Sequence, residues 1–85
     1  MIINIKDLKN KIIYRANYRG TKEMDKLLGA FTKKYIDQLN DVELLLLCDL
    51  LDLDDENLYK FNQGQETTVI IELNKVSKLF KNYEY

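Results

Sequence analysis

Apolar residues recur at helical spacing along most of the chain, and polar residues fill the positions between them. In an α-helix, such spacing places the apolar side chains together on one face. The pattern predicts five helices joined by short polar or glycine-containing turns, over residues 6–18, 21–38, 41–53, 56–62 and 68–82. Short turns favour neighbouring helices that pack against each other. The sequence therefore predicts an all-α fold, a compact bundle of five short helices.

The third predicted helix, residues 41–53, contains a run of four leucines and is apolar on nearly every side. A helix that is apolar all round is buried, so we expect this helix at the centre of the bundle. Asn40 is placed to cap it, with Glu43 completing a capping box. We expect truncation of Leu46 or Leu50 to alanine to cost about 2–5 kcal/mol of stability.

The last two predicted helices begin after residues that cap helices well. Asp54 or Asp55 is expected to cap the fourth helix, and Thr67 or Thr68 is expected to cap the fifth. The run Val69-Ile70-Ile71 has local strand propensity, which competes with the helical pattern at the start of the fifth helix. Spacing of the apolar residues over 68–82 nevertheless favours a helix.

Length and composition indicate one globular domain over residues 1–85. Hydrophobic residues make up 46% and charged residues 32%, proline is absent, and no linker or repeat interrupts the pattern. The longest apolar run is far shorter than the roughly 20 residues of a membrane span. The N-terminus lacks the build of a secretion signal or a transit peptide. We expect a cytoplasmic monomer without membrane insertion.

The residue types exclude most catalytic and metal sites. The chain has no histidine and a single cysteine, Cys48, which is expected to be a small buried apolar residue. Histidine-based acid–base catalysis, nucleophile–histidine pairs and the usual zinc sites are therefore absent. The acidic segment 52–56 lacks the spacing and the glycine of a calcium-binding loop. We expect no catalytic residues, no metal site and no enzymatic activity.

Charge is divided unevenly along the chain, although the net charge is only −1. Residues 1–34 carry a net charge of +6, and residues 35–62 carry −7. One interpretation is that the two halves attract each other within the bundle, and another is an acidic protein partner. A third is a small helical nucleic-acid-binding protein that uses the basic N-terminal helices. The sequence pI of about 5.4 argues against the third interpretation.

The joint between the first two predicted helices has the chemistry of a helix end followed by a helix start. Gly20 can take the left-handed conformation of a C′ residue, which ends many helices. Thr21 can cap the next helix, and Glu23 and Asp25 fall in its first turn, where the helix dipole favours anions.

The string Arg-Gly-Thr-Lys-Glu-Met-Asp at residues 19–25, preceded by Tyr14-Arg15 and Tyr18, resembles the signature of the succinate dehydrogenase assembly factor 2 family. The core pattern of the family is Arg-Gly-x-x-Glu. The resemblance continues at Phe31 and through the acidic turn and helix of residues 55–61. Relatives usually carry tryptophan at the position of Phe61.

The resemblance implies a small helical protein that is a maturation factor and not an enzyme. Family members bind the flavoprotein subunit of succinate dehydrogenase and promote covalent attachment of FAD to a histidine of that subunit. The FAD then belongs to the partner, and no cofactor is expected to bind this chain stably. The flavoprotein of fumarate reductase is a further candidate partner.

The resemblance also implies which residues contact the partner. Arg19 would reach acidic or carbonyl groups of the flavoprotein, and Gly20 would allow close approach of the backbone. Glu23 would bond back to Arg19 or pair with a cation of the partner. The surrounding rim would consist of Arg15, Tyr18, Lys22, Met24 and Asp25.

Overall fold

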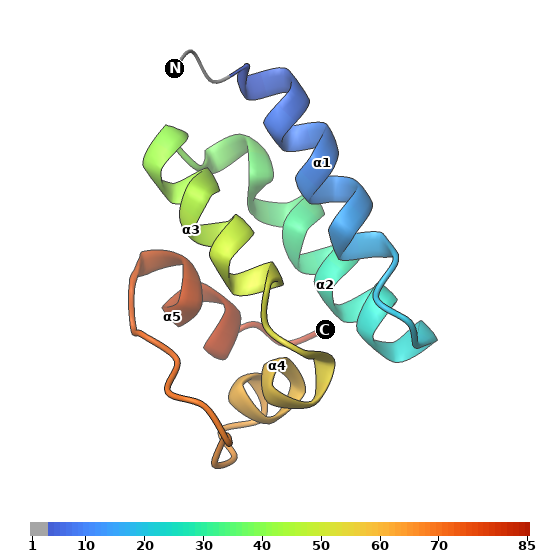
Figure 1. Ribbon diagram of the computed structural model, residues 1–85, viewed down its shortest axis with the longest axis vertical. Helices are drawn as coiled ribbons and strands as arrows, with labels where there is room; N and C mark the ends of the chain where they lie inside the picture. Colours follow the sequence, from blue (N-terminus) through green and yellow to red (C-terminus); the bar gives the residue numbers. More distant parts are fainter. Residues whose placement is uncertain (1–3) are drawn as a thin grey trace.

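Five α-helices and one short 3₁₀ turn make up the computed structural model, which describes residues 4–85 (Figure 1). The elements are α1 (Ile5–Asn17), α2 (Lys22–Tyr35), η1 (Ile36–Gln38), α3 (Asp41–Leu51), α4 (Asp55–Asn62) and α5 (Lys75–Lys81). Between residues 4 and 85 there is no β-strand. The expected all-α fold with five helices is confirmed.

The helices form two groups that share one core. Helices α1 and α2 run antiparallel along one side, joined by a tight turn, and α3 packs against α1 (Figure 1). The shorter helices α4 and α5 pack against each other, and α5 also packs against α3. Among the described helices, none combines the length and the apolar character that a membrane span requires.

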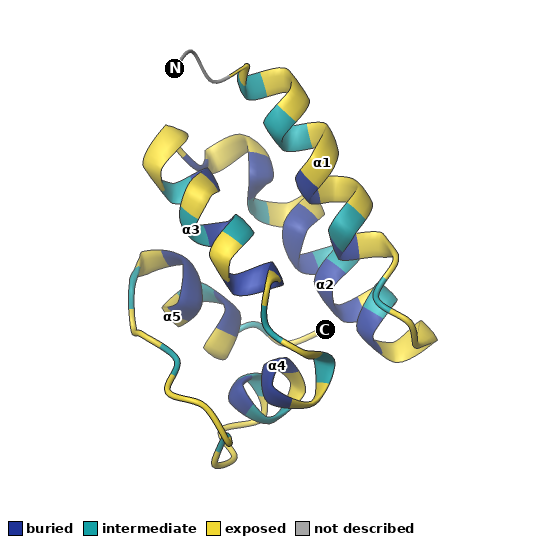
Figure 2. Cartoon of the chain, viewed as in Figure 1, coloured by how far each residue is buried: buried dark blue, intermediate teal, exposed yellow. Residues whose placement is uncertain are grey.

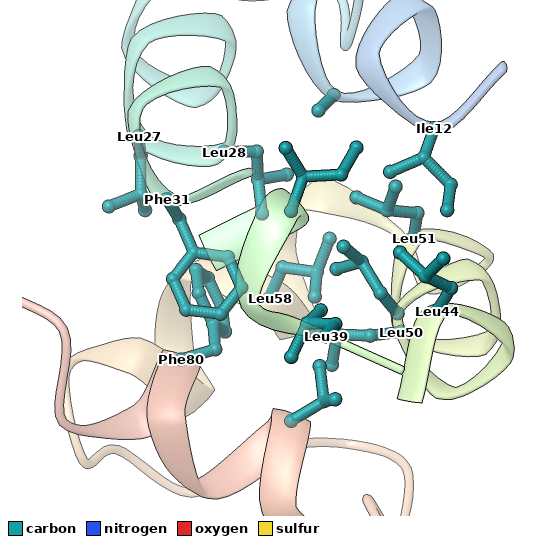
Figure 3. Close-up of a cluster of buried hydrophobic side chains, with 14 of the residues drawn as sticks. Ile12, Leu27, Leu28, Phe31, Leu39, Leu44, Leu50, Leu51, Leu58 and Phe80 are labelled. Atoms are coloured by element: carbon teal, nitrogen blue, oxygen red, sulfur yellow. The ribbon is translucent and has the colours of Figure 1, made fainter. Parts of the chain in front are cut away.

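The core collects apolar side chains from all five helices, including Phe31 of α2 (Figure 3), and every helix has buried positions along its length (Figure 2). The Phe31 ring lies 5.1 Å from the Phe80 ring of α5 and 5.4 Å from the Tyr83 ring, both edge to face. Such edge-to-face packing is a favoured arrangement of aromatic rings. Leu58 of α4 and Ile12 of α1 are also fully buried, so each helix is anchored to this cluster.

Helix α3 is buried on one side only, and the expectation of burial all round is wrong. Its buried leucines are Leu44, Leu47, Leu50 and Leu51. Val42 is 67% exposed and Leu45 is 42% exposed, because α1 and α5 cover only part of the helix surface. Leu46 is half-buried, so the large cost expected for its truncation applies to Leu50 and not equally to Leu46.

Helix α5 begins at Lys75, and the expected helix over 68–82 is wrong for residues 68–74. Asn74 caps α5: its side chain accepts a hydrogen bond from the Ser77 backbone N–H, and the Ser77 hydroxyl accepts one from the Asn74 N–H. These paired bonds satisfy backbone donors that a helix start leaves free. The helix therefore starts where this cap stands.

The residues before α5 are held by α4 instead of forming a helical turn. The Thr68 N–H donates to the buried Asn57 side chain, 2.8 Å away, so Thr68 does not cap a helix. Asn57 also bonds to the Thr68 hydroxyl and to Asp54. A buried amide that satisfies its neighbours in this way pins the connection to α4. The strand propensity of residues 69–71 produces neither a strand nor a helix.

Most expected helix starts are confirmed. Asn40 and Glu43 form the expected capping box, and Thr21 caps α2. Of the two aspartates considered for α4, Asp54 is the cap. A Cβ on Gly29 would lie 2.5 Å from the side-chain oxygen of Asn17 at the end of α1, which explains a glycine inside α2.

Cys48 is half-buried, and its burial raises the pKa of its thiol. A raised pKa keeps the thiol protonated and unreactive at neutral pH. The expectation of a buried apolar residue is therefore met only in part. Among residues 4–85, no group of three or more cysteine and carboxylate side chains is arranged to hold a metal ion.

Candidate partner-binding corner

The turn between α1 and α2 forms a corner of the molecule (Figure 1). Tyr18 is the C-cap residue of α1, and Gly20 follows two residues later with φ of +120°. Gly20 is therefore not the C′ residue of α1, although it does take a backbone conformation that favours glycine. A Cβ added to Gly20 would lie 3.9 Å from the Asp55 carboxylate oxygen, its nearest neighbour, so there is room for it. The backbone angle, and not crowding, requires the glycine.

Arg19 points into the molecule and joins the corner to the turn between α3 and α4. Its Nε donates to Asp55 at 2.9 Å, and its two terminal nitrogens donate to the carbonyl oxygens of Leu51 and Leu53, each at 2.7 Å. The carbonyls at the end of α3 have no partner within that helix, so the guanidinium satisfies groups that would otherwise lack one. The Arg19 side chain is only 11% exposed.

These contacts correct the expected role of Arg19. Its donors are used within the chain, and it does not bond to Glu23 in the described structure. The backbone N–H of Arg19 donates to the Asp25 carboxylate, which fixes the turn to the first turn of α2. A planar guanidinium that reaches three acceptors at once holds the corner in one orientation.

Arg15 makes a second contact between the basic and acidic parts of the chain, an ion pair with Asp52. Lys9 pairs in the same way with Asp37 at 3.1 Å. Three of the basic residues in the N-terminal part therefore face acidic residues of the same molecule. The interpretation that the two oppositely charged halves attract each other is confirmed for these contacts.

The eight residues predicted to contact a partner divide between the surface and the interior. Tyr18, Gly20, Lys22 and Glu23 are exposed. Met24 is buried in the core, and Arg15, Arg19 and Asp25 are partly buried and bonded within the chain. Met24 therefore cannot form part of an exposed rim. The corner offers to a partner a bare backbone at Gly20 and one charge of each sign beside it.

Two further features lie next to the corner. Tyr14 stacks on Tyr18 with the ring centroids 4.7 Å apart, and both rings face solvent. Their spacing of four residues is the sequence signal for this contact. A surface hollow of about 600 Å³ lies between α2, α4 and the C-terminal residues, with Glu23 on its edge. No local pattern marks that hollow, because its walls come from distant segments.

Comparison with known proteins adds a family to this geometry. The family model described as "Flavinator of succinate dehydrogenase" matches residues 10–84. A curated relative, "Succinate dehydrogenase assembly factor 2, mitochondrial" from Meyerozyma guilliermondii, is 39% identical over 51 residues, which cover 60% of this chain. The match spans 38% of the length of that relative.

No solved structure matches the chain. The family model, by contrast, covers the corner, the α3–α4 turn that Arg19 binds, and all the helices from within α1 to α5. The expected resemblance is confirmed: this chain belongs to the family of flavinators of succinate dehydrogenase.

Proposed function

We propose that this protein is an assembly factor that binds the flavoprotein subunit of succinate dehydrogenase and promotes covalent attachment of FAD to that subunit. The family match over residues 10–84 is the observation that carries the proposal. The curated relative is named as a succinate dehydrogenase assembly factor, and this name supports the same role. The protein acts as a cytoplasmic monomer, and the FAD belongs to its partner.

The contribution of this chain is conformational and not catalytic. Without histidine, it has no imidazole to move protons during flavin attachment. A protein that binds one conformation of a partner more tightly than another shifts the partner toward that conformation. The assembly factor binds the flavoprotein in the conformation in which the histidine of the flavoprotein and the flavin can react.

The α1–α2 corner is the contact surface of this proposal. Arg19 holds the corner against the α3–α4 turn, so the contact surface does not have to be ordered on binding. Gly20 lets the partner approach the backbone, and the exposed Lys22 and Glu23 supply charges of both signs. The nucleic-acid hypothesis has less support, because three basic residues of the N-terminal helices already pair with acidic residues of the chain.

Co-expression with a succinate dehydrogenase flavoprotein subunit, in a host that lacks its own factor, tests the proposal. Covalent flavin is read as fluorescence of the flavoprotein band after denaturing electrophoresis. The wild-type chain should raise this signal well above an empty vector, and equal signals would refute the function. A parallel expression with a fumarate reductase flavoprotein tests the second candidate partner.

A matched pair of variants then tests the corner. Glu23→Ala removes an exposed charge at the corner and should lower flavin attachment. Glu72→Ala removes an exposed glutamate from the segment before α5 and should leave flavin attachment unchanged. Equal activity of the two variants would show that Glu23 does not contribute to the contact.

A further inference from the structure

The outward face of α1 carries two large aromatic side chains that the fold of this chain does not use. Tyr14 is 64% exposed and Tyr18 is 70% exposed. Tyr14 lies on the side of α1 away from Ile12 and Ala16, which are fully buried, and Tyr18 follows as the C-cap residue. Neither tyrosine belongs to the core cluster or to the apolar residues packed against it. Their exposure therefore needs a reason outside the core of this molecule.

The two rings form one preorganised surface. Their centroids are 4.7 Å apart with a tilt of 36° between the ring planes, so each ring restricts the other. Within residues 4–85 neither hydroxyl makes a hydrogen bond, which leaves both free to bond elsewhere. Tyrosine offers a large, rigid contact area with a polar tip, and few rotatable bonds have to be fixed on binding. Residues of this kind often dominate the binding energy of protein interfaces.

The position of the ring pair links it to the proposed contact corner, and a lysine lies nearby on α1. Tyr18 directly precedes the Arg19-Gly20 turn, so the ring pair is continuous with the proposed contact corner. Lys11, three residues before Tyr14 on α1, is exposed and makes no ion pair within the described part of the chain. A partner surface complementary to this arrangement has an apolar hollow for the rings and an acidic group at its rim.

We propose that the stacked Tyr14–Tyr18 pair is the aromatic anchor of the interface and inserts into an acid-rimmed apolar hollow of the flavoprotein subunit. Lys11 faces the acidic rim. The proposal rests on the proposed function for the identity of the partner. It assigns the main binding contribution to the ring pair, while Arg19 positions the corner from inside.

The fold permits a clean test of this anchor. Both tyrosines are exposed and lie outside the core cluster, so Tyr14→Ala and Tyr18→Ala should change the free energy of unfolding by no more than about 0.5 kcal/mol. Ile70, which is 98% exposed, and Leu73, which is 54% exposed, both lie on the segment before α5 and provide matched controls. Ile70→Ala and Leu73→Ala remove exposed apolar surface away from α1 and from the corner.

Binding of the purified wild-type chain and its variants to an immobilised, FAD-loaded flavoprotein subunit is measured by biolayer interferometry. Each tyrosine variant should weaken binding at least tenfold, and the two control variants should bind within about twofold of wild type. Lys11→Glu should lower the association rate, most strongly at low salt.

Three results would overturn the anchor, and they differ in which other parts of the proposal remain valid. If the tyrosine variants bind like wild type while Glu23→Ala binds weakly, the corner remains the contact and the anchor is wrong. If the wild-type chain itself does not bind the flavoprotein, the proposed partner is wrong and the anchor falls with it. Equal weakening by the control variants would also contradict a local anchor.

Discussion

Replacement of Arg19 by alanine removes the side-chain hydrogen bonds that join the α1–α2 corner to the α3–α4 turn. The variant loses three hydrogen bonds and leaves the Leu51 and Leu53 carbonyls and the Asp55 carboxylate without that partner. A hydrogen bond to a charged group contributes about 1.5–3 kcal/mol, and removal of one partner also leaves the other groups unsatisfied. The free-energy contributions of three such bonds to one side chain do not simply add.

Solvent reduces this magnitude, since the Asp55 side chain is 27% exposed while that of Arg19 is only 11% exposed. We therefore expect Arg19→Ala to lower the free energy of unfolding by about 2–4 kcal/mol. For a domain of this size, 1 kcal/mol corresponds to about 4–8 °C in melting temperature, so the midpoint should fall by roughly 8–32 °C. A small domain has only about 5–15 kcal/mol of stability in total.

Urea unfolding followed by circular dichroism at 222 nm measures this loss. Arg15→Ala is the matched control, because Asp52, the partner of Arg15, is 65% exposed and such a surface pair contributes about 0–1 kcal/mol. Arg19→Lys should be intermediate, because one ammonium group cannot reach three separate acceptors. If the free energy of unfolding of Arg19→Ala is within about 0.5 kcal/mol of the wild-type value, the Arg19 hydrogen bonds do not stabilise the fold. Arg19 would then be free to bind a partner.

Three further predictions concern other parts of the bundle. Asn17→Ala removes the side-chain oxygen that would lie 2.5 Å from a Cβ on Gly29. The double variant Asn17→Ala with Gly29→Ala should therefore be about 0.5–1 kcal/mol more stable in urea unfolding than Asn17→Ala alone. A lower stability of the double variant would contradict the packing at the end of α1. Thr32 is buried and its hydroxyl has no hydrogen-bond partner within the described residues, so Thr32→Val should raise the melting temperature by removing an unsatisfied group; a lower temperature would show that the hydroxyl is bonded. The Asn40 N–H donates a hydrogen bond to the Glu43 carboxylate and lowers the pKa of Glu43. The ionised carboxylate therefore stabilises the fold above the ordinary glutamate pKa of about 4.3, and this stabilisation is lost as the pH falls through the lowered value. Glu43→Gln should therefore lose less stability between pH 5 and pH 3 than wild type, and parallel urea midpoints for the two proteins would refute this.

Local chemistry made the helical fold predictable. Asn40, Thr21 and Asp54 cap their helices with side chains that bond to backbone groups only three residues away, and such contacts are visible in the sequence. The apolar spacing of α1 and α2 likewise identified the faces that became buried. The start of α5 was missed because the buried Asn57 side chain, eleven residues before Thr68, captures the segment that local propensity assigned to a helix.

The candidate site was predictable in position but not in the direction of its side chains. The sequence by itself determined a glycine turn between two capped helices. The Arg-Gly-x-x-Glu pattern, together with the longer resemblance around it, indicated the family that the family model confirmed. Only the tertiary structure decided that Arg19 points inward, because its acceptors lie 32 to 36 residues away and meet it only when α3 and α4 pack beside the corner. The same packing leaves Tyr14 and Tyr18 outside the core. Spacing along one helix shows which side chains share a face, but contacts between helices decide which face is buried and which remains for a partner.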